Sequence, residues 1–336
     1  MSIITDVLGR FGDPDDIALK LLDNMIWPIL AIVIIAILAL APQTFRNFRS
    51  IELILWGGVA LGLLVLAESL CLLSGNFDLS IGSIAGFSAM LTGMVLGTCP
   101  SCWAITSSPF VGFVLILTIG GTIGLVNGIM IGRYGLNPFL QTLAFLIIFQ
   151  GAKTSLNTQP ISGLPDLYLL PGGTPWIAIG IMLAAFALFG YVMTYTRFGQ
   201  AVYAIGSNEK AARDVGINTE RVIIVVYTIS GMLSAVAGLV ITGFTGVVPP
   251  LIGEGLVFQA FAGAVIGGIS LFGGRGVITG ALGGVILIKV VESALSNSAS
   301  VGATEIQMFN GMVLLAAILL YSTQDRLRSR ILASGA

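Results

Sequence analysis

Long apolar stretches make up most of the chain, and short polar segments separate them. A helix that crosses a lipid bilayer needs about 20 mostly apolar residues. By this criterion the pattern predicts about ten membrane-spanning helices, near residues 25–41, 52–73, 79–98, 110–132, 138–155, 175–195, 221–246, 256–272, 275–291 and 308–322. The short or glycine-rich stretches 79–98 and 256–291 are typical of broken or re-entrant segments, which protein must surround. The expected fold class is an all-α integral membrane protein.

The composition also indicates a lipid-embedded chain. Of its 336 residues, 56% are hydrophobic and only 9% are charged, whereas a soluble domain carries roughly 25% charged residues. The 44 glycines fit the same class, because small residues let membrane helices approach closely. We expect packing faces at the run from Gly120 to Gly124 and at the pair Gly283 and Gly284.

Several function classes are excluded by what the sequence lacks. The chain has no histidine, which removes the usual general base, metal ligand and proton relay, so we expect no catalytic residue and no metal site. A net charge of -1 provides no attraction for nucleic acid, and the acidic N-terminus is unlike a cleavable signal peptide. No nucleotide-binding G-x-x-x-x-G-K-[ST] motif occurs. Energy must therefore come from a partner protein or from an ion gradient.

Basic residues predict the orientation, because positively charged loops stay in the cytoplasm. With the N-terminus inside, the cytoplasmic loops and tail hold Arg133, Arg197, Lys210, Arg213, Arg221, Arg275, Arg326, Arg328 and Arg330. The outer loops 99–109, 156–174 and 247–255 hold no basic residue. Arg46 and Arg49 fit this orientation poorly, and the alternative is a missed span near the N-terminus.

The predicted domain organisation follows from these spans. A cytoplasmic N-terminal segment (1–24) precedes a single membrane domain (25–322), and a cytoplasmic tail (323–336) follows. One long polar insert interrupts the membrane domain at about 196–221, on the cytoplasmic side.

The insert contains a short helix of its own. Ser207 or Asn208 is a suitable N-cap, and Gly216 suits the left-handed position after the C-terminus. A helix of about two turns is not stable alone in water, so its small apolar face must dock on something. That face consists of Ala211, Ala212 and Val215. Docking on the chain's own membrane domain and docking on a separate cytoplasmic protein both remain open.

Several sequence motifs occur in an order that resembles a known family. The pieces are LLSGNFDLSIGSIAG at 72–86, NPFLQTLAFLIIFQGAKTSLNTQPI at 137–161 and, between 198 and 282, AIGSNEKAARDVGIN, SGMLSAVAGLV and AVIGGISLFGGRGVITGALGG. They resemble the permease subunits of the ribose, xylose, arabinose and galactoside family of bacterial ABC importers. The resemblance extends from about residue 50 to the end of the chain.

This resemblance implies a fold and a set of partners. The fold would be that of a type II ABC importer permease, similar to the membrane subunit of the vitamin B12 importer, in the bacterial inner membrane with both termini cytoplasmic. A second permease copy or a related permease would complete the path through the membrane lipid. Two ATPase subunits would hold ATP and Mg²⁺, and a periplasmic solute-binding protein would deliver a sugar-like substrate.

In this family the helix of the insert is the coupling helix, which contacts the ATPase. The resemblance therefore assigns ATPase coupling to Ser207, Asn208, Glu209, Lys210, Ala211, Ala212, Arg213, Asp214 and Gly216. Two departures from the family pattern leave the cargo open between a sugar, a nucleoside and an autoinducer. Acids that usually follow Gly253-Glu254-Gly255 are absent, and Asn76 stands where glycine is more common. Glu254 is a candidate contact for the binding protein.

The candidate translocation path consists of Glu68, Asn76, Phe77, Asp78, Asn137, Phe139, Gln141 and Thr142. Asp78 precedes the third span, where it can cap a helix and also act as a pivot. Glu68 lies about 7–8 Å inside the second span. It is therefore protonated, hydrogen-bonded between helices or in contact with an aqueous cavity.

Polar residues in the fifth predicted span allow two interpretations. Asn137, Gln141, Thr142 and Gln150 recur with some helical regularity, so they can bind the hydroxyls of a solute or connect helices. Lys153, near the outer end of this span, is expected to extend its ammonium group towards water, and so is Lys289.

Cysteines and one glycine-rich segment complete the candidates. Cys99 and Cys102 lie in a predicted outer loop, where the oxidising periplasm permits a disulfide, whereas Cys71 is expected to be a small apolar residue within a span. The segment from Gly273 to Gly276 predicts a tight inner turn between two spans.

Two other functions were weighed against the permease. A secondary transporter driven by an ion gradient would need carboxylates near the membrane centre, and only Glu68 qualifies. An enzyme would need a nucleophile–base pair or paired carboxylates, which the sequence does not contain. We therefore expect a transport subunit whose ATP hydrolysis takes place on a separate chain.

Overall fold

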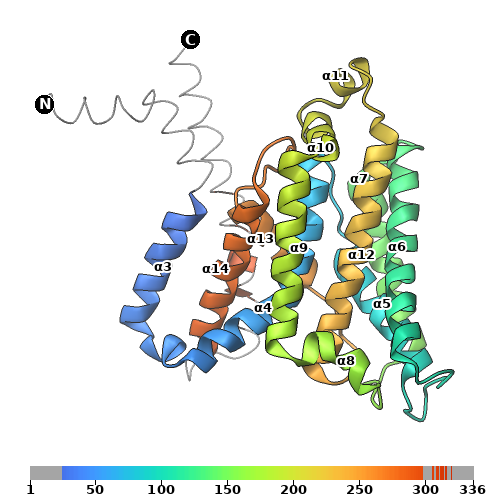
Figure 1. Ribbon diagram of the computed structural model, residues 1–336, viewed down its shortest axis with the longest axis vertical. Helices are drawn as coiled ribbons and strands as arrows, with labels where there is room; N and C mark the ends of the chain where they lie inside the picture. The colour runs from blue at the N-terminus through green and yellow to red at the C-terminus, as the bar shows by residue number, and fades with distance from the viewer. Residues whose placement is uncertain are drawn as a thin grey trace, which may run out of the picture.

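The computed structural model describes residues 25–297 and, beyond them, residues 305, 308, 309, 311–313, 315 and 319. Within these residues the protein is helical (Figure 1), with one isolated β-bridge between Ile161 and Val248. The helices are α3 (Ile26–Leu40), η1 (Pro42–Phe45), α4 (Phe48–Leu73), α5 (Ile81–Leu96), α6 (Pro109–Gly132), α7 (Pro138–Leu156), α8 (Asp166–Gly173), α9 (Pro175–Tyr195), α10 (Arg197–Ser207), α11 (Glu209–Asp214), α12 (Thr219–Thr245), α13 (Leu256–Ile266) and α14 (Ile278–Ser296).

Six of these helices are long and apolar enough to cross a membrane, namely α4, α6, α7, α9, α12 and α14. Three shorter apolar helices, α3, α5 and α13, fall in other predicted spans. The tenth predicted span, 308–322, lies largely outside the described residues, as do the terminal segments 1–24 and 323–336. The count of about ten spans therefore stays a prediction.

The first broken span consists of residues 74–80 and α5. Its beginning lies beside α10, because the Leu73 carbonyl accepts a hydrogen bond from the Gly274 amide and contacts Gly206. Asp78 contacts Ser230 of α12. Ser230 lies about 16 Å from the start of that helix, at 1.5 Å per residue. The α5 helix therefore begins part-way across the bundle. With 16 residues it spans about 24 Å, less than the ~30 Å hydrocarbon core.

The second broken span lies antiparallel to the first. After α12 the chain turns back, and Val248 pairs with Ile161. The backbone then passes α5 so closely that a Cβ atom on Gly86 would clash with the Ile252 carbonyl, and one on Gly82 with the Gly253 carbonyl. The α13 helix follows. The first extended half is largely enclosed by protein, with Ser74, Asn76, Asp78 and Ser80 buried, as non-helical backbone at membrane depth requires. In the second, Ile252 is buried and Leu251 is exposed.

Glycines also bring the long helices together, as expected. A Cβ atom on Gly120 would meet the backbone carbonyl of Gly231, and one on Gly124 that of Tyr227, so α6 and α12 are in direct backbone contact. Gly283 faces Ile26 of α3, and Gly284 faces the backbone of α13. These contacts confirm both predicted packing faces.

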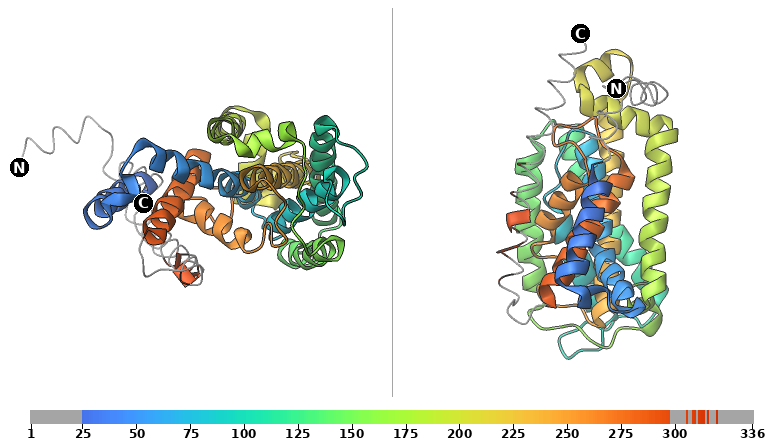
Figure 2. Two further views of the ribbon diagram at one scale, coloured as in Figure 1. Left: turned by 90° about the horizontal axis from the view of Figure 1, so that it is seen from below. Right: turned by 90° about the vertical axis from the view of Figure 1, so that its left-hand side faces the viewer.

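The two ends of the bundle, at the top and bottom of Figure 1 and of the right-hand view of Figure 2, differ in the charged residues that they hold. The end with α10 and α11 also holds the turns that contain Arg133 and Arg275. Arg133 lies 3.8 Å from Glu220 at the start of α12, and Gly274, next to Arg275, contacts Ser207 at the end of α10. The opposite end holds α8 and the loop that precedes α6. Between α3 and α4 the described chain has only the short helix η1, so Arg46 stays at this opposite end.

Candidate functional site

The predicted coupling segment forms a projection at the basic end of the bundle (Figure 1). Asn208 is the N-cap of α11, since its side chain accepts a hydrogen bond from the Ala211 amide at 3.1 Å. Ser207 is instead the last residue of α10. Gly216 follows α11 with a φ of +88°, as expected of a C-terminal glycine. The two-turn helix of the prediction is therefore present.

The expected apolar face of α11 is wrong in part. Among residues 207–216 only Ala212 is buried, and Val215 is 77% exposed. The helix ends at Asp214, so Val215 lies beyond its last turn and does not share the face of Ala212. Ala212 packs α11 against the helical bundle, and the other side chains of the segment are available to a partner.

The sequence interpretation missed α10, which holds α11 in place. Val202 and Ile205 form the buried face of α10. The Tyr203 hydroxyl of the same helix donates a hydrogen bond to the Gly276 carbonyl at 2.8 Å. Burial raises the pKa of Tyr203 above its usual value. The spacing of Val202 and Ile205 after the N-cap Thr196 is that of an amphipathic helix and could have revealed it.

A cavity of about 770 Å³ lies beside α11, between the turn after α6 and the start of α12. Its charged groups form two ion pairs, Arg213 with Glu209 at 2.8 Å and Arg133 with Glu220 at 3.8 Å. Asn76 also lines this cavity. Of the predicted path residues, Asn76 and Asn137 therefore reach the basic end.

Asp78 is fully buried where the first broken span turns into α5. Its carboxylate accepts hydrogen bonds from the Ser80 amide at 3.0 Å and from the Ser230 hydroxyl at 2.9 Å. The N-cap of α5 is Ser80, so the prediction that Asp78 caps this helix is wrong. Asp78 connects the extended half of the span to α12, while Phe77 accepts a hydrogen bond from Tyr227.

Two polar residues of α7, Gln141 and Thr142, connect it to neighbouring segments of the described chain. Thr142 accepts a hydrogen bond from the Leu79 amide at 3.0 Å, and the Gln141 amide lies 3.5 Å from the Asn127 side chain. Asn137 is the N-cap of α7, and the following Phe139 is half exposed. This supports the helix-connecting interpretation for Gln141 and Thr142.

Glu68 has no hydrogen-bond partner among the described residues, although both of its oxygens are buried. Of the three alternatives for Glu68, a hydrogen bond between helices is therefore not present within the described residues. Apolar side chains of α4 precede and follow Glu68, including the fully buried Leu64 and Leu72. Protein rather than lipid encloses this carboxyl group.

The expectation that Lys153 extends its ammonium group towards water is wrong. Lys153 is 1% exposed, and its Nζ donates hydrogen bonds to the Ile252 carbonyl at 3.2 Å and to Glu254 at 2.8 Å. This ion pair joins α7 to the extended half of the second broken span. The Lys289 ammonium group pairs with Glu292 at 2.7 Å. The aliphatic part of Lys153 packs against Gly86 of α5, and that of Lys289 packs against Gly58 of α4, where there is no side chain in the way.

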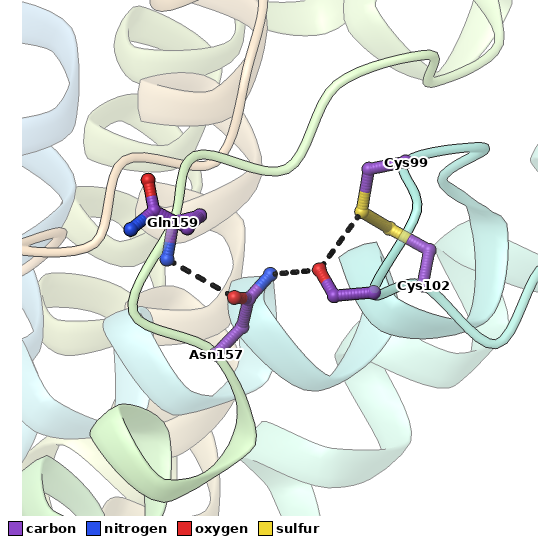
Figure 3. Close-up of a disulfide and its surroundings, with 5 residues drawn as sticks. Cys99, Cys102, Asn157 and Gln159 are labelled. Carbon is purple, nitrogen blue, oxygen red and sulfur yellow. Dashed lines mark hydrogen bonds between the residues drawn. A yellow bond between two sulfur atoms is a disulfide. The ribbon is translucent and has the colours of Figure 1, made fainter.

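Cys99 and Cys102 form a disulfide in the loop at the end opposite to α11 (Figure 3). Asn157, which follows α7, donates a hydrogen bond to Ser101 at 3.0 Å and accepts one from the Gln159 amide. The disulfide loop is thereby attached to the end of α7. Cys71 is buried and free.

Comparison with known proteins places this architecture in a family. The family described as "Branched-chain amino acid transport system / permease component" matches residues 50–321. The chain belongs to this permease family. The match starts in α4 and includes both broken spans and the predicted coupling segment, so the permease is a multi-pass membrane protein of a transport system.

Curated relatives cover most of the permease. The ribose import permease protein RbsC of Bacillus subtilis (strain 168) is 34% identical over 77% of this chain and 80% of its own. The L-arabinose transport system permease protein AraH of Escherichia coli (strain K12) is 30% identical over 87% and 88%. The autoinducer 2 import system permease protein LsrC of Photorhabdus laumondii is 30% identical over 82% and 84%. No solved structure matches the permease.

Proposed function

We propose that the permease is the membrane-spanning subunit of an ATP-binding-cassette importer that carries a sugar or a similar polyhydroxylated solute into a bacterial cell. Membership of the permease family supports the transporter class. The relatives named for ribose and L-arabinose import support a sugar-like cargo. The transport subunit itself has no catalytic role.

The observation that carries the coupling proposal is the exposed α11 at the basic end of the bundle. Every residue from 207 to 216 except Ala212 is exposed, and the chain has no nucleotide-binding motif. An ATPase that docks on α11 would supply the energy, with ATP and Mg²⁺ bound to the ATPase. Two such subunits, a second permease and a periplasmic binding protein complete the proposed assembly.

Contacts beneath α11 provide a route from the ATPase to the broken spans. The Gly274 amide donates a hydrogen bond to the Leu73 carbonyl at 3.0 Å, and Gly206 packs against both of these backbone groups. A displacement of α10 and α11 would therefore move the end of α4 and the turn before α14 together. Because the first broken span begins directly after Leu73, its orientation would change as well.

Reconstituted transport tests this function. Proteoliposomes are prepared with the permease, its ATPase and its binding protein, and uptake of radiolabelled D-ribose and L-arabinose is measured. We expect uptake that requires ATP at the ATPase side and persists when proton and sodium gradients are collapsed. Uptake that follows an ion gradient and ignores ATP would refute the proposal.

A further inference from the structure

A second cavity, of about 510 Å³, lies between α5, α7 and the second broken span. Its volume is within the range of small-molecule sites, roughly 300–1,000 Å³. The cavity contains none of the predicted path residues. Part of its lining is the extended backbone from Leu251 to Gly255, which stands where a continuous second span would present a helix.

One wall of this cavity carries a fixed set of hydrogen-bonding groups. Lys153 Nζ has three protons, and the Ile252 carbonyl and Glu254 accept two of them. Glu254 keeps a side chain that is 33% exposed. The Gln150 side chain lines the same cavity and makes no hydrogen bond within residues 25–297, so its amide is free to bind a ligand.

Apolar side chains of α7 and α13 line much of the rest of the cavity. Leu143, Leu146 and Phe258 line the cavity, and Phe258 is 55% exposed. The charges of Lys153 and Glu254 cancel within the cavity, so an ionic solute would have to break their pair. A neutral solute with several hydroxyls can donate to Glu254, accept from Lys153 and Gln150, and place its C–H face against Phe258.

We propose that this cavity binds the neutral polyhydroxylated solute during its passage, with Gln150, Lys153 and Glu254 as the hydrogen-bonding groups. The inference rests on the proposed function and adds a location to it. In this site Lys153 positions Glu254, and Gln150 is the group whose hydrogen-bonding capacity is not used within residues 25–297.

Thiol labelling tests whether the cavity admits water and solute. Gln150→Cys is introduced with Cys71→Ala, which leaves the Cys99–Cys102 disulfide intact, and the assembled importer is treated with a charged methanethiosulfonate. The matched control is Thr118→Cys on α6, which is exposed but lies among Phe110, Val111 and Val114 in an apolar groove. We expect labelling at position 150 only, slowed at least threefold by D-ribose or L-arabinose and not by glycine betaine.

Uptake by Gln150→Leu gives a second readout, with the amount of inserted permease as the folding control. We expect at least a tenfold lower rate of sugar uptake, whereas Thr118→Leu transports normally. An unlabelled Gln150→Cys, labelling insensitive to sugar, or normal uptake by Gln150→Leu overturns the inference while the proposed function stands. If the wild-type importer takes up neither sugar with ATP, the proposed function fails and the inference falls with it.

Discussion

Lys153 and Glu68 are both ionisable residues inside the bundle, yet their surroundings differ. The Lys153 ammonium group has Glu254 and a backbone carbonyl as partners. The Glu68 carboxyl group has no hydrogen-bond partner in the described chain. A buried polar group without a partner costs stability, whereas a paired one costs stability mainly when its partner is removed. The two residues therefore predict opposite mutational effects.

Replacement of Glu254 by alanine should destabilise the permease. The change leaves the Lys153 ammonium buried with one carbonyl partner, and we expect a loss of about 2–3 kcal/mol, below the ~3–5 kcal/mol of a fully buried pair because Glu254 is partly exposed. Lys153→Met should cost less, since water can reach the remaining carboxylate. The free energy of unfolding in mixed micelles is measured for both variants. Equal losses would contradict the expectation that removal of Glu254 costs more than removal of Lys153.

Replacement of Glu68 by leucine should stabilise the fold. Leucine has a similar size and removes two buried oxygens without partners, so we expect a gain of about 1–3 kcal/mol. The same unfolding assay measures it, with Leu64→Ala as a cavity-forming control that should cost about 2–5 kcal/mol. A destabilised Glu68→Leu would show that the carboxyl group has a partner in the assembled protein.

At the scale of elements, the close approach of α5 to the second broken span depends on two glycines. Gly86→Ala places a methyl group against the Ile252 carbonyl, so we expect loss of most folded permease. Gly180→Ala in α9, where an added Cβ meets nothing within 4 Å, should be neutral or stabilise the helix by up to about 1 kcal/mol. Size-exclusion yield after detergent extraction compares the two variants. Equal yields would contradict the backbone contact.

The α11 helix should recognise its partner through the exposed side. Val215→Asp puts a charge on the apolar exposed residue, and we expect at least a tenfold loss of co-purified ATPase. Ile105→Asp makes the same type of change at the opposite end, where Ile105 is 69% exposed, and should retain the ATPase. Co-purification unaffected by Val215→Asp would remove α11 from the ATPase interface. A bulky replacement of Ala212 should instead weaken ATPase binding by displacing α11 from the bundle against which Ala212 packs.

The length of the apolar stretches in the sequence predicted the long helices well, but it was less informative about the short helices α5, α10 and α13. The glycine-rich stretches 79–98 and 256–291 contain the short helices α5 and α13, each of which follows an extended half, but α14 in the second stretch is a continuous helix long enough to cross a membrane. The exact start of α5 depended on Ser80, Asp78 and Ser230, which meet only after α12 has packed. The α10 helix is short and polar on one side, so it produced no membrane signal.

For the whole molecule, the separation of charge between the two ends makes a topological prediction. Basic residues favour the cytoplasmic side, and those of the described loops gather at the α11 end except for Arg46 and Arg49. In a Cys71→Ala background, Val215→Cys should react with an impermeant maleimide only in inside-out vesicles, and Ile105→Cys only in right-side-out vesicles. The reverse pattern would invert the proposed orientation.

By itself the sequence determined the class, most of the helices, the charged end and the family, because these depend on local composition and on motif order. The tertiary structure alone decided the partners of the polar residues. Lys153 and Glu254 are 101 positions apart, and Thr142 and Leu79 are 63 apart, so neither pair leaves a local pattern. Whether a polar side chain in such a bundle connects helices, lacks a partner or lines a cavity depends on which backbone packs against it, and that arrangement exists only in the folded chain.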